Sequence, residues 1–314
     1  MKILVTGGAG FIGSNVVDEY VSLGHEVVVV DDLSTGFEHN VNPEATFYKV
    51  DIRSKELAEV FDKEKPEIVN HHAAQISVPV SVKDPEFDAE VNVVGFLNLL
   101  QNCVKYNVKK VISISSGGAI YGEAEEYPTT ENYNPVPLSP YAINKLVSEK
   151  YLHFYHHQFG LNYTVLRYAN VFGPRQIPHG EAGVVSIFIT NFLNDIQSHL
   201  YAFKEKPDGM IRDYVFVKDI VNANVIALKK GNLDAFNIGT GLETTTGELY
   251  REISNQMNEN VEPIKGDARP GDIRKSCLHI EKARKKLGWE PVFSLQEGVR
   301  ETIDFFVKKA KEGL

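Results

Sequence analysis

The chain has 314 residues, of which 43% are hydrophobic and 24% are charged, as is typical of a globular protein in water. Its formal net charge of −9 argues against nucleic-acid binding, so any phosphate group is expected to be held locally by a few arginines. Because no apolar run reaches about 18 residues and no signal peptide precedes the first strand-like segment, we expect no membrane association and a cytoplasmic location.

The first half of the chain alternates short β-branched runs with helical segments. Strands are predicted at Ile3–Thr6, Glu26–Asp31, Thr46–Val50, Ile68–His71, Val111–Ser115 and Tyr163–Tyr168. Helices are predicted at Phe11–Leu23, Ser54–Lys65, Glu86–Asn107 and Ser139–Phe159. The valine run that ends at Asp31 is typical of a strand buried on both faces. This alternation predicts an α/β fold, a Rossmann-type doubly wound parallel sheet.

The second half is less regular, with proline, glycine and charge clustered at Gly173–Gly183 and Lys204–Gly209. Further elements are predicted as a strand at Tyr214–Val217, a helix at Asp219–Lys230, a strand at Ala235–Ile238 and a helix at Gly247–Asn258. We expect residues 1–169 to form the dinucleotide-binding domain, to which the chain returns at about residues 213–239. Residues 170–212 and 240–314 would form a smaller C-terminal α/β lobe for substrate, with Trp289 as an anchor of its core.

A glycine-rich turn joins the first predicted strand to the first predicted helix, with Gly7, Gly10 and Gly13 in the pattern Gly-x-x-Gly-x-x-Gly. Glycine permits a tight turn and lets the backbone approach a pyrophosphate at the helix N-terminus. Asp31 ends the second strand about 24 residues after Gly7, near the spacing of a carboxylate that binds a ribose diol and repels a 2′-phosphate. The glycines alone would also fit a turn without a ligand, but in this context they predict NAD rather than NADP.

Tyr141 and Lys145 lie four residues apart on the predicted helix Ser139–Phe159 and therefore on one face. The preceding Ser139 and Pro140 are typical of a helix start, which puts Tyr141 in the first turn. There the helix dipole, the lysine and an oxidised nicotinamide would all lower the phenol pKa from about 10 toward neutrality, as a general base requires. On an arbitrary helix such a pair is surface decoration. Here it follows a strand that ends in serines, and ligands bind at such strand ends.

Eight segments resemble the extended short-chain dehydrogenase/reductase family, and most closely its UDP-hexose 4-epimerases, over essentially the whole chain. They are VTGGAGFIGS (from Val5), HHAAQISV (from His71), SSGGAIYGE (from Ser115), SPYAINK (from Ser139), LRYANVFGPRQ (from Leu166), IRDYVFVKD (from Ile211), FNIGTG (from Phe236) and RPGDIRKS (from Arg269). The resemblance implies NAD-dependent 4-epimerisation of UDP-glucose and UDP-galactose through a transient 4-keto sugar, with NAD retained. It also implies a role in galactose metabolism and a homodimer formed through the helices Glu86–Asn107 and Ser139–Phe159, for which the alternative is burial of both helices against the chain's own sheet.

The resemblance further implies individual roles. Tyr141 would be the catalytic base, Lys145 would contact the nicotinamide ribose, and Ser116, or alternatively Ser115, would be the hydroxyl partner. The expected NAD contacts are Gly7, Gly10, Phe11, Ile12, Gly13, Asp31, Asp51, Ile52, Ala73, Ala74, Tyr141 and Lys145. The expected substrate contacts are Ser116, Asn170, Val184, Phe203, Arg212, Arg269, Asp272 and Ser276.

Among the substrate contacts, Arg212 and Arg269 match phosphate-binding arginines, for which the alternative is solvated surface charge. Asp272 matches a uridine-ribose ligand, and Phe203 lies where a side chain meets the uracil. The family often has glycine where this chain has Lys204, which leaves the geometry of the uracil pocket open.

Other reactions of the family begin in the same way. A 4,6-dehydratase is disfavoured because it carries Asp-Glu where this chain has Ser116 and Gly117. A UDP-glucuronate 4-epimerase or a decarboxylase stays open as an alternative, whereas a non-catalytic NAD-binding regulator would have lost the Tyr/Lys pair. The small Ser276 suggests that UDP-GlcNAc and UDP-GalNAc are also accepted, unless it is ordinary loop polarity. No metal site is expected.

Overall fold

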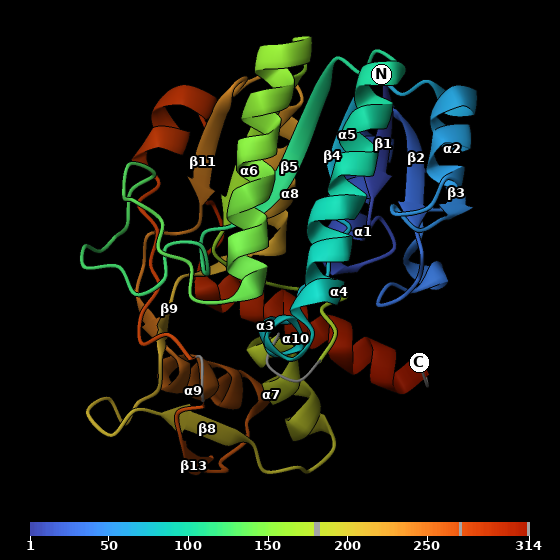
Figure 1. The fold of residues 1–314 in the computed structure, drawn as a ribbon. Coiled ribbons are helices and arrows are strands. Elements are labelled where there is room, and N and C mark those ends of the chain that lie inside the picture. The colour runs from blue at the N-terminus through green and yellow to red at the C-terminus, as the bar shows by residue number, and fades with distance from the viewer. Residues whose placement is uncertain (179–182, 270–271, 313–314) are drawn as a thin grey trace.

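A computed structural model describes residues 1–178, 183–269 and 272–312. Its centre is a seven-stranded sheet in the order β11-β6-β5-β4-β1-β2-β3, with every neighbouring pair parallel and helices on both faces (Figure 1). The strands are β1 (Lys2–Thr6), β2 (Glu26–Asp31), β3 (Thr46–Lys49), β4 (Ile68–His71), β5 (Lys110–Ser116), β6 (Asn162–Tyr168) and β11 (Asp234–Ile238). The predicted Rossmann-type doubly wound sheet is thereby confirmed.

Two apolar cores cover the two faces of this sheet. Ile3 and Val5 of β1 pack in one core with α1 and α8, and Leu4 between them packs in the other with α2, α5 and α6. Alternate residues of a strand point to opposite faces, so a strand covered by helices on both sides needs an unbroken apolar run. The helices are α1 (Phe11–Ser22), α2 (Glu56–Glu64), α5 (Phe96–Lys105), α6 (Pro140–Phe159) and α8 (Val217–Ala227).

The helix predicted at Glu86–Asn107 is present as an unbroken helical run over residues 85–105 with a π-helical stretch inside it. The segment between β4 and α5 differs from the prediction by a further short helix before this run. It forms two short helices, α3 (Val78–Lys83) and α4 (Pro85–Ala89), and then a π-helical segment, η2 (Glu90–Gly95), that leads into α5. Each short helix is capped at its start, by Ser77 and by Asp84, and polar caps of this kind favour separate helices. The periodicity of the sequence does not distinguish one helix from this succession.

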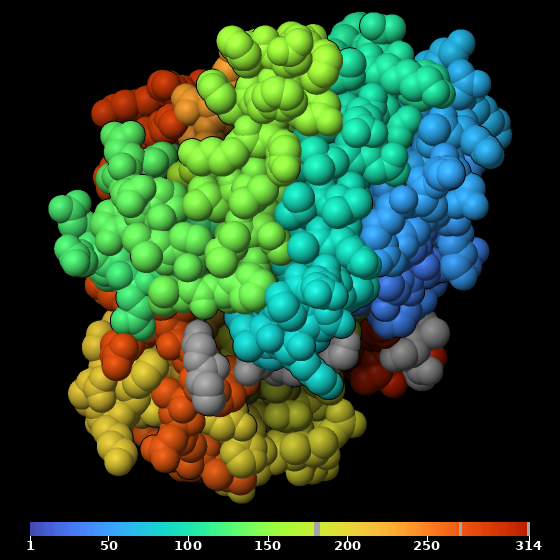
Figure 2. Space-filling view, in the orientation of Figure 1, coloured from blue at the N-terminus to red at the C-terminus, as the bar shows by residue number. Residues whose placement is uncertain are grey.

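A third core lies below the sheet, in the part of the chain coloured yellow to red (Figures 1 and 2). Phe188, Tyr250 and Val299 pack there, contributed by three different helices. These helices are α7 (Val184–Leu193), α9 (Thr246–Met257) and α10 (Leu295–Glu312), beside the parallel pair β8 (His199–Ala202) and β13 (Ile264–Asp267). Two small pairs lie between the lobes: β7 (Asn170–Phe172) with β10 (Tyr214–Phe216), and β9 (Ile211–Arg212) with β12 (Thr244–Thr245).

Trp289 corrects an expectation. It is fully buried, but in the sheet core that also contains Ile220 and Ala223 of α8, and not in the C-terminal lobe. Its indole Nε1 donates to the carbonyl oxygen of Asp219 at 3.0 Å, which satisfies the one polar atom of the ring. The chain therefore returns to the sheet side at this point before α10 begins.

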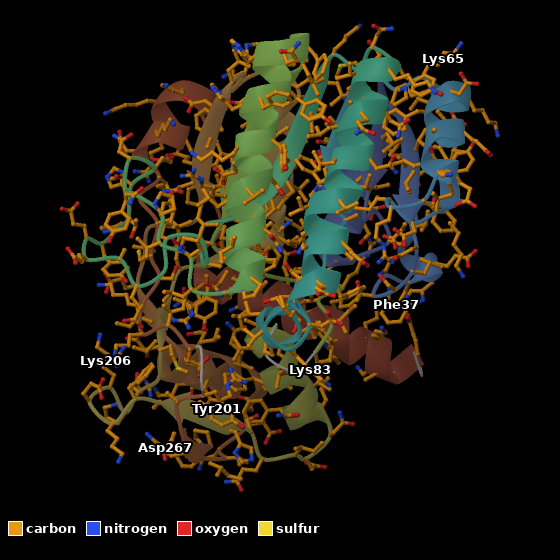
Figure 3. All side chains as sticks on the ribbon, in the orientation of Figure 1. Phe37, Lys65, Lys83, Tyr201, Lys206 and Asp267 are labelled. Carbon is orange, nitrogen blue, oxygen red and sulfur yellow. The ribbon has the colours of Figure 1, made fainter. Side chains whose placement is uncertain are left out.

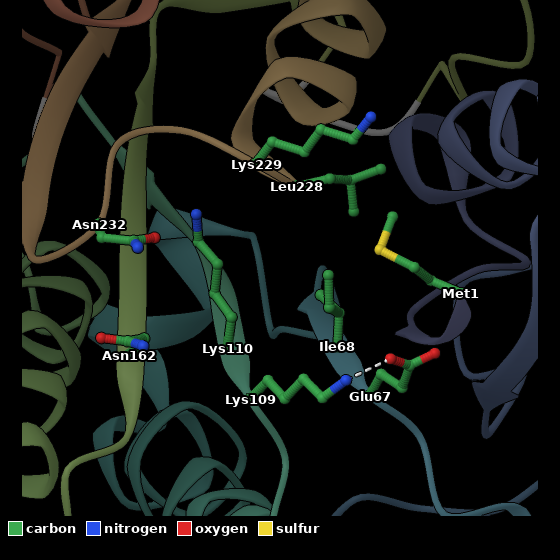
Figure 4. A pocket seen from close by; sticks show the side chains of 9 residues that line it. All are labelled: Met1, Glu67, Ile68, Lys109, Lys110, Asn162, Leu228, Lys229 and Asn232. Atoms are coloured by element: carbon green, nitrogen blue, oxygen red, sulfur yellow. Dashed lines mark hydrogen bonds and ion pairs between the residues drawn. The ribbon is translucent and has the colours of Figure 1, made fainter.

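A pocket of about 240 Å³ lies at the amino ends of the strands (Figure 4). It is lined by Met1, Glu67, Ile68, Lys109, Lys110, Asn162, Leu228, Lys229 and Asn232. The Lys110 ammonium donates to the carbonyl oxygens of Ala227 and Lys230, at 2.6 Å each, just beyond α8. Lys109 pairs with Glu67 at 2.6 Å. The glycine turn lies at the opposite edge of the sheet.

Within the described ranges, no helix is long and apolar enough to cross a bilayer.

Candidate active site

The glycine turn between β1 and α1 is too close to its surroundings for side chains. Gly7 has a φ of 69°, and a Cβ added there would lie 2.6 Å from the backbone nitrogen of Ala73. A Cβ on Gly13 would lie 2.2 Å from the carbonyl oxygen of Gly7. Helix α1 starts after Gly10 with no side-chain cap, so its first N–H groups are available to an anion. This cradle fits the pyrophosphate of a dinucleotide.

The residues expected around the adenosine and the rest of NAD flank this turn. Asp31, buried at the end of β2, accepts hydrogen bonds from the backbone N–H groups of Ala9 (3.0 Å) and Leu33 (2.9 Å). Burial raises the pKa of its carboxyl. Asp51 binds Arg53 through both carboxylate oxygens, which holds the pKa of Asp51 below its usual range. That arginine is therefore occupied and does not offer a site for a 2′-phosphate.

The remaining predicted NAD contacts are close to the same turn. Phe11 and Ile12 open α1 and pack partly against the C-terminal core and the sheet core, respectively. Ile52 is buried directly after Asp51. Ala73 and Ala74 follow β4 after His72, and the backbone N–H of Ala73 donates to Thr6 Oγ1 at 3.3 Å.

Tyr141, Lys145 and Ser116 are brought together at the carboxyl end of β5. Ser139 caps α6 by accepting from the N–H of Ala142 at 3.2 Å, which fixes Tyr141 in the first turn. The Lys145 ammonium lies 5.8 Å from the Tyr141 ring centroid and donates to the carbonyl oxygen of Ile114 at 3.2 Å. Ser116 is near enough to the Tyr141 phenol to lower its pKa, against the effect of burial.

The two candidate serines point to different partners. Ser115 donates to Glu149 at 2.6 Å, and that carboxylate also forms a buried ion pair with Arg167. Successive residues of a strand face opposite sides of the sheet, so Ser115 and Ser116 cannot both face Tyr141. The geometry favours Ser116 as the hydroxyl partner and gives Ser115 a place in the packing of α6.

The ionisation of the Tyr141–Lys145 pair corrects part of the expectation from sequence. Burial raises the pKa of Tyr141 to about 12, against a lowering by the hydrogen bond from Ser116. Burial lowers the pKa of Lys145 to about 8, against a raising by the carboxylate of Asp88. The protein's own groups therefore do not bring the phenol toward neutrality, because the cost of burying an anion outweighs the hydrogen bond.

His71, which ends β4, is buried, and His72, which follows it, is half-buried; a lowered pKa keeps both rings neutral. His71 Nδ1 lies 2.7 Å from Thr6 Oγ1, and its ring stacks on Phe96 with the centroids 4.8 Å apart, as suits a structural residue. Burial and the nearby Lys145 lower the pKa of His72 to about 3. Among the described residues, His72 Nε2 is buried and has no hydrogen-bond partner, so this edge of the sheet keeps an unused polar atom.

Asn170 and Ser276 face Gly118, two residues beyond Ser116. A Cβ on Gly118 would lie 3.5 Å from Asn170 Oδ1 and 4.0 Å from Ser276 Oγ. Asn170 Oδ1 is buried without a partner in the described part of the chain. A buried polar atom without a partner at the end of the sheet is suited to a ligand.

The two predicted phosphate-binding arginines are both partly buried. Burial lowers the pKa of Arg212, which ends β9, and the carboxylate of Asp272 opposes this shift. Arg269 donates its backbone N–H to Asp272 Oδ2 at 2.8 Å and stacks 4.7 Å from the ring centroid of Tyr201. The arginines are therefore held by the fold and are not solvated surface charge. Val184 begins α7, next to residues 179–182, which lie outside the described ranges.

Phe203 is covered by an arginine that the sequence analysis did not single out. Arg274 lies 4.4 Å from the Phe203 ring centroid and forms ion pairs with Glu123 (3.1 Å) and Glu205 (3.2 Å). The charged stretch after Phe203 forms an exposed turn, from which Lys206 projects at the outer edge of the lobe (Figure 3). Of the charges of this turn, Glu205 pairs with Arg274, and Asp208 pairs with Arg251 of α9 at 2.8 Å.

Within the described part of the chain, no group of three or more His, Cys, Asp or Glu side chains is arranged to hold a metal ion. A second residue missed from the sequence is Asp88 of α4, which is fully buried beside α6. Its signal was weak: an aspartate on a helix is ordinarily exposed, and only the fold shows that this one is not.

Comparison with known proteins gives the family. Residues 3–239 match the profile of the NAD dependent epimerase/dehydratase family. A UDP-glucose 4-epimerase from Thermotoga maritima, solved with UDP-glucose, is 48% identical with a TM-score of 0.96, and the match covers 99% of this chain and 100% of that one.

Two further solved structures are similar over nearly their whole length. A UDP-glucose 4-epimerase from Thermus thermophilus, in complex with NAD, is 45% identical with a TM-score of 0.93, covering 98% of this chain and 99% of that one. A UDP-N-acetylglucosamine 4-epimerase from Methanobrevibacter ruminantium, in complex with UDP-N-acetylmuramic acid, is 35% identical with a TM-score of 0.92, covering 98% of both chains.

Proposed function

Because the chain belongs to the NAD-dependent epimerase/dehydratase family of extended short-chain dehydrogenases/reductases, we propose that it interconverts UDP-glucose and UDP-galactose by epimerisation at C4. The observation that carries this proposal is the grouping of Tyr141, Ser116 and Lys145 at the carboxyl end of β5. The strand neighbouring β5 on one side is β4, whose other neighbour β1 leads into the glycine turn, so acid–base groups and cofactor cradle share one edge of the sheet.

NAD, when bound, supplies a hydride acceptor and donor at C4 of the sugar. The glycine turn and Asp31 would hold its pyrophosphate and adenosine ribose. Tyr141 takes the proton of the C4 hydroxyl and later returns it, and Ser116 hydrogen-bonds the same oxygen. Lys145, with one backbone hydrogen bond, keeps further donors for the nicotinamide ribose and favours the phenolate by its charge.

The substrate's diphosphate would be held by Asn170, Arg212 and Arg269, and its uridine by Asp272 and Phe203. The partial burial of both arginines supports this assignment, because a guanidinium desolvated by the protein binds a phosphate more strongly than one in water. Val184 is placed at the same site by the resemblance alone.

The substrate range is proposed to include UDP-GlcNAc and UDP-GalNAc. The support is Ser276, a small buried side chain that faces Gly118 and Asn170. Ser276→Tyr should abolish turnover of the N-acetyl sugars while UDP-glucose and UDP-galactose are still interconverted. Rates of all four substrates would be measured for both proteins, with Ser276→Ala as the matched control. Equal loss on both substrate pairs would refute the assignment.

We also propose a homodimer built on η2, α5 and α6. The support is a set of exposed apolar side chains on neighbouring helices: Val94 on η2, and Ile143 and Phe154 on α6. Sedimentation should give about twice the monomer mass, and Ile143→Glu should shift it toward the monomer. The cytoplasmic location and the role in galactose metabolism stay predictions from the sequence.

The decisive experiment is NMR of the purified protein incubated with UDP-glucose and no added NAD. Growth of UDP-galactose signals is expected, because a cofactor that is regenerated in each cycle need not be supplied. Net NADH release would indicate a dehydrogenase instead, and loss of the C6 oxygen a dehydratase. A parallel incubation with UDP-glucuronate tests the alternative epimerase and the decarboxylase, and turnover there alone would overturn the proposal.

A further inference from the structure

Asp88 is a buried carboxylate with unusual partners. It has 0% exposure, and every hydrogen bond it receives comes from a side-chain amide. Gln75 Nε2 and Asn92 Nδ2 donate to Oδ1 at 2.6 and 3.1 Å, and Asn144 Nδ2 donates to Oδ2 at 2.7 Å. Both oxygens thus act as acceptors, which is the arrangement of an ionised carboxylate. Among the described residues, no Lys or Arg forms an ion pair with it.

The three amides connect Asp88 to three of the segments around Lys145. Gln75 belongs to the loop after β4, Asn92 to the π-helical segment η2, and Asn144 directly precedes Lys145 on α6. Gln75 and Asn92 also bond each other, through the N–H and carbonyl oxygen of Gln75 at 3.1 and 2.9 Å. π-helical segments inside helices occur frequently at functional sites. The network therefore fixes the face of α6 that carries the acid–base pair.

The charges around this pair leave Asp88 as the uncompensated anion. From β4, His71 and His72 face Lys145 in their neutral forms. From β5, Ser116 meets Tyr141, and Ser115 leads to Glu149, whose charge is neutralised by Arg167. Asp88, from α4, acts on both Tyr141 and Lys145.

We propose that Asp88 is the counter-charge of Lys145, a positioning residue that keeps the lysine protonated and anchors it beside Tyr141. The proposal rests on the proposed function. A buried ammonium needs either enough hydrogen-bond acceptors or a nearby anion, and Lys145 has one carbonyl acceptor, at 3.2 Å. Among the described residues around it, Asp88 is the buried carboxylate that forms no ion pair of its own. It acts through amides and through space and does not touch the reacting atoms.

Removing the charge of Asp88 shifts the pKa values of Lys145 and Tyr141 in the same direction. A neutral side chain at position 88 disfavours the protonated lysine, so the pKa of Lys145 falls. It also favours the tyrosinate, so the pKa of Tyr141 falls as well. Both limbs of the pH profile of kcat/KM should therefore move to lower pH together. A residue with only a packing role would lower the rate or the stability and leave both limbs in place.

The test is Asp88→Asn, which keeps the shape and removes the charge. Both limbs of the kcat/KM profile for UDP-glucose should move down by about half a pH unit or more. The matched control is Asn144→Ala, which removes one amide but keeps the charge. It should lower the melting temperature and leave the limbs within about 0.2 units of those of the wild type. Asp88→Ser removes the same charge with room for a water and replaces Asp88→Asn if that variant does not fold.

A second measurement is independent of turnover. The NMR signal of the Lys145 side-chain carbon next to the ammonium is assigned with Lys145→Arg and titrated in the wild type and in Asp88→Asn. The midpoint should fall in the variant. Unchanged limbs and midpoint in both neutral variants would overturn the role of Asp88 while wild-type epimerisation still stands. Absence of epimerisation by the wild type would instead overturn the proposed function. The NMR titration would then be the remaining test of whether Asp88 keeps Lys145 protonated.

Discussion

Two buried lysines lie at opposite edges of the same sheet and differ in how they are satisfied. Lys145, at the carboxyl edge, is 7% exposed, and Lys110, at the amino edge, is 5% exposed. Burial lowers the pKa of each to about 8. Lys110 donates to two carbonyl oxygens at 2.6 Å, whereas the described part of the chain offers Lys145 a single carbonyl at 3.2 Å.

This difference indicates that Lys110 has a structural role, whereas Lys145 is available for binding and catalysis. At the amino edge, the buried ammonium closes the end of α8 and has little left to offer a ligand. At the carboxyl edge, Lys145, His72 Nε2 and Asn170 Oδ1 are buried with hydrogen-bonding capacity to spare. Neither burial nor a shifted pKa identifies the active site here, because both edges have them. Single buried polar atoms without a partner also occur elsewhere, such as Ser54 Oγ and His156 Nδ1. What marks the carboxyl edge is that several such atoms lie there beside Lys145.

The largest difference between the two edges of the sheet is expected at Tyr141, because the amino edge has no equivalent tyrosine. Tyr141→Phe removes only the phenolic oxygen and should reduce kcat by about 10²- to 10⁴-fold, since proton transfer loses its group. Tyr151→Phe, on the same helix, should keep wild-type turnover. Initial rates of UDP-galactose formation measure both. Retained turnover in Tyr141→Phe would assign the acid–base role to another residue.

The next largest effect is expected at Lys145. Lys145→Met keeps the length of the side chain and removes its charge, so kcat should fall by about 10²-fold while the melting temperature changes little. The reason is that the ammonium has one long hydrogen bond, and Asp88 keeps its three amide donors when the lysine charge is removed. Turnover and thermal unfolding are measured on the same preparation. A large loss of stability would make Lys145 a structural residue like Lys110.

Lys110→Met is the reciprocal substitution. It leaves the carbonyl oxygens of Ala227 and Lys230 without their ammonium donor and should lower the free energy of unfolding by roughly 1–3 kcal/mol. Turnover at a temperature where the variant is folded should match the wild type. Urea denaturation and initial rates test the two halves of this expectation. An unchanged stability would show that the satisfied lysine is as dispensable to folding as Lys145 is expected to be.

The sheet was largely predictable from sequence, because its pattern is local. The valine run that ends at Asp31 and the helical periodicity after Gly10 each show their element within a few residues, and the alternation of strands and helices predicts a parallel sheet. The lobe below was less predictable. Strands β8 and β13 are four residues each, and they pair across about 60 positions of sequence. Short segments of this kind have no clear period, and only their packing stabilises them.

The site divides in the same way. Four of the site residues belong to motifs that short spacings in the sequence are enough to recognise: Gly7, Asp31, Tyr141 and Lys145. Asp88 and Arg274 do not, because each acquires its surroundings from distant segments: Asn144 lies 56 residues from Asp88, and Glu123 lies 151 residues from Arg274. The sign of the Tyr141 shift was also beyond the sequence, since it depends on how deeply the fold buries the ring. Sequence motifs show which titratable groups are present, but they do not show how far the fold removes those groups from water.

The smallest expected effect concerns the exposed part of the carboxyl side, where Arg274 stacks on Phe203. Arg274→Gln removes the cation and its ion pairs with Glu123 and Glu205 but no proposed contact to the sugar. A cation–π contact at an exposed site contributes about 0.5–1 kcal/mol, so KM for UDP-glucose should rise about two- to fivefold with kcat unchanged. Arg284→Gln, on an exposed arginine of the sheet side with similar weak ion pairs, is the matched control and should leave KM unaltered. Steady-state rates over a range of UDP-glucose concentrations decide between them. A fall in kcat instead would mean that the turn after Phe203 affects the chemical step and not only the binding of the uracil.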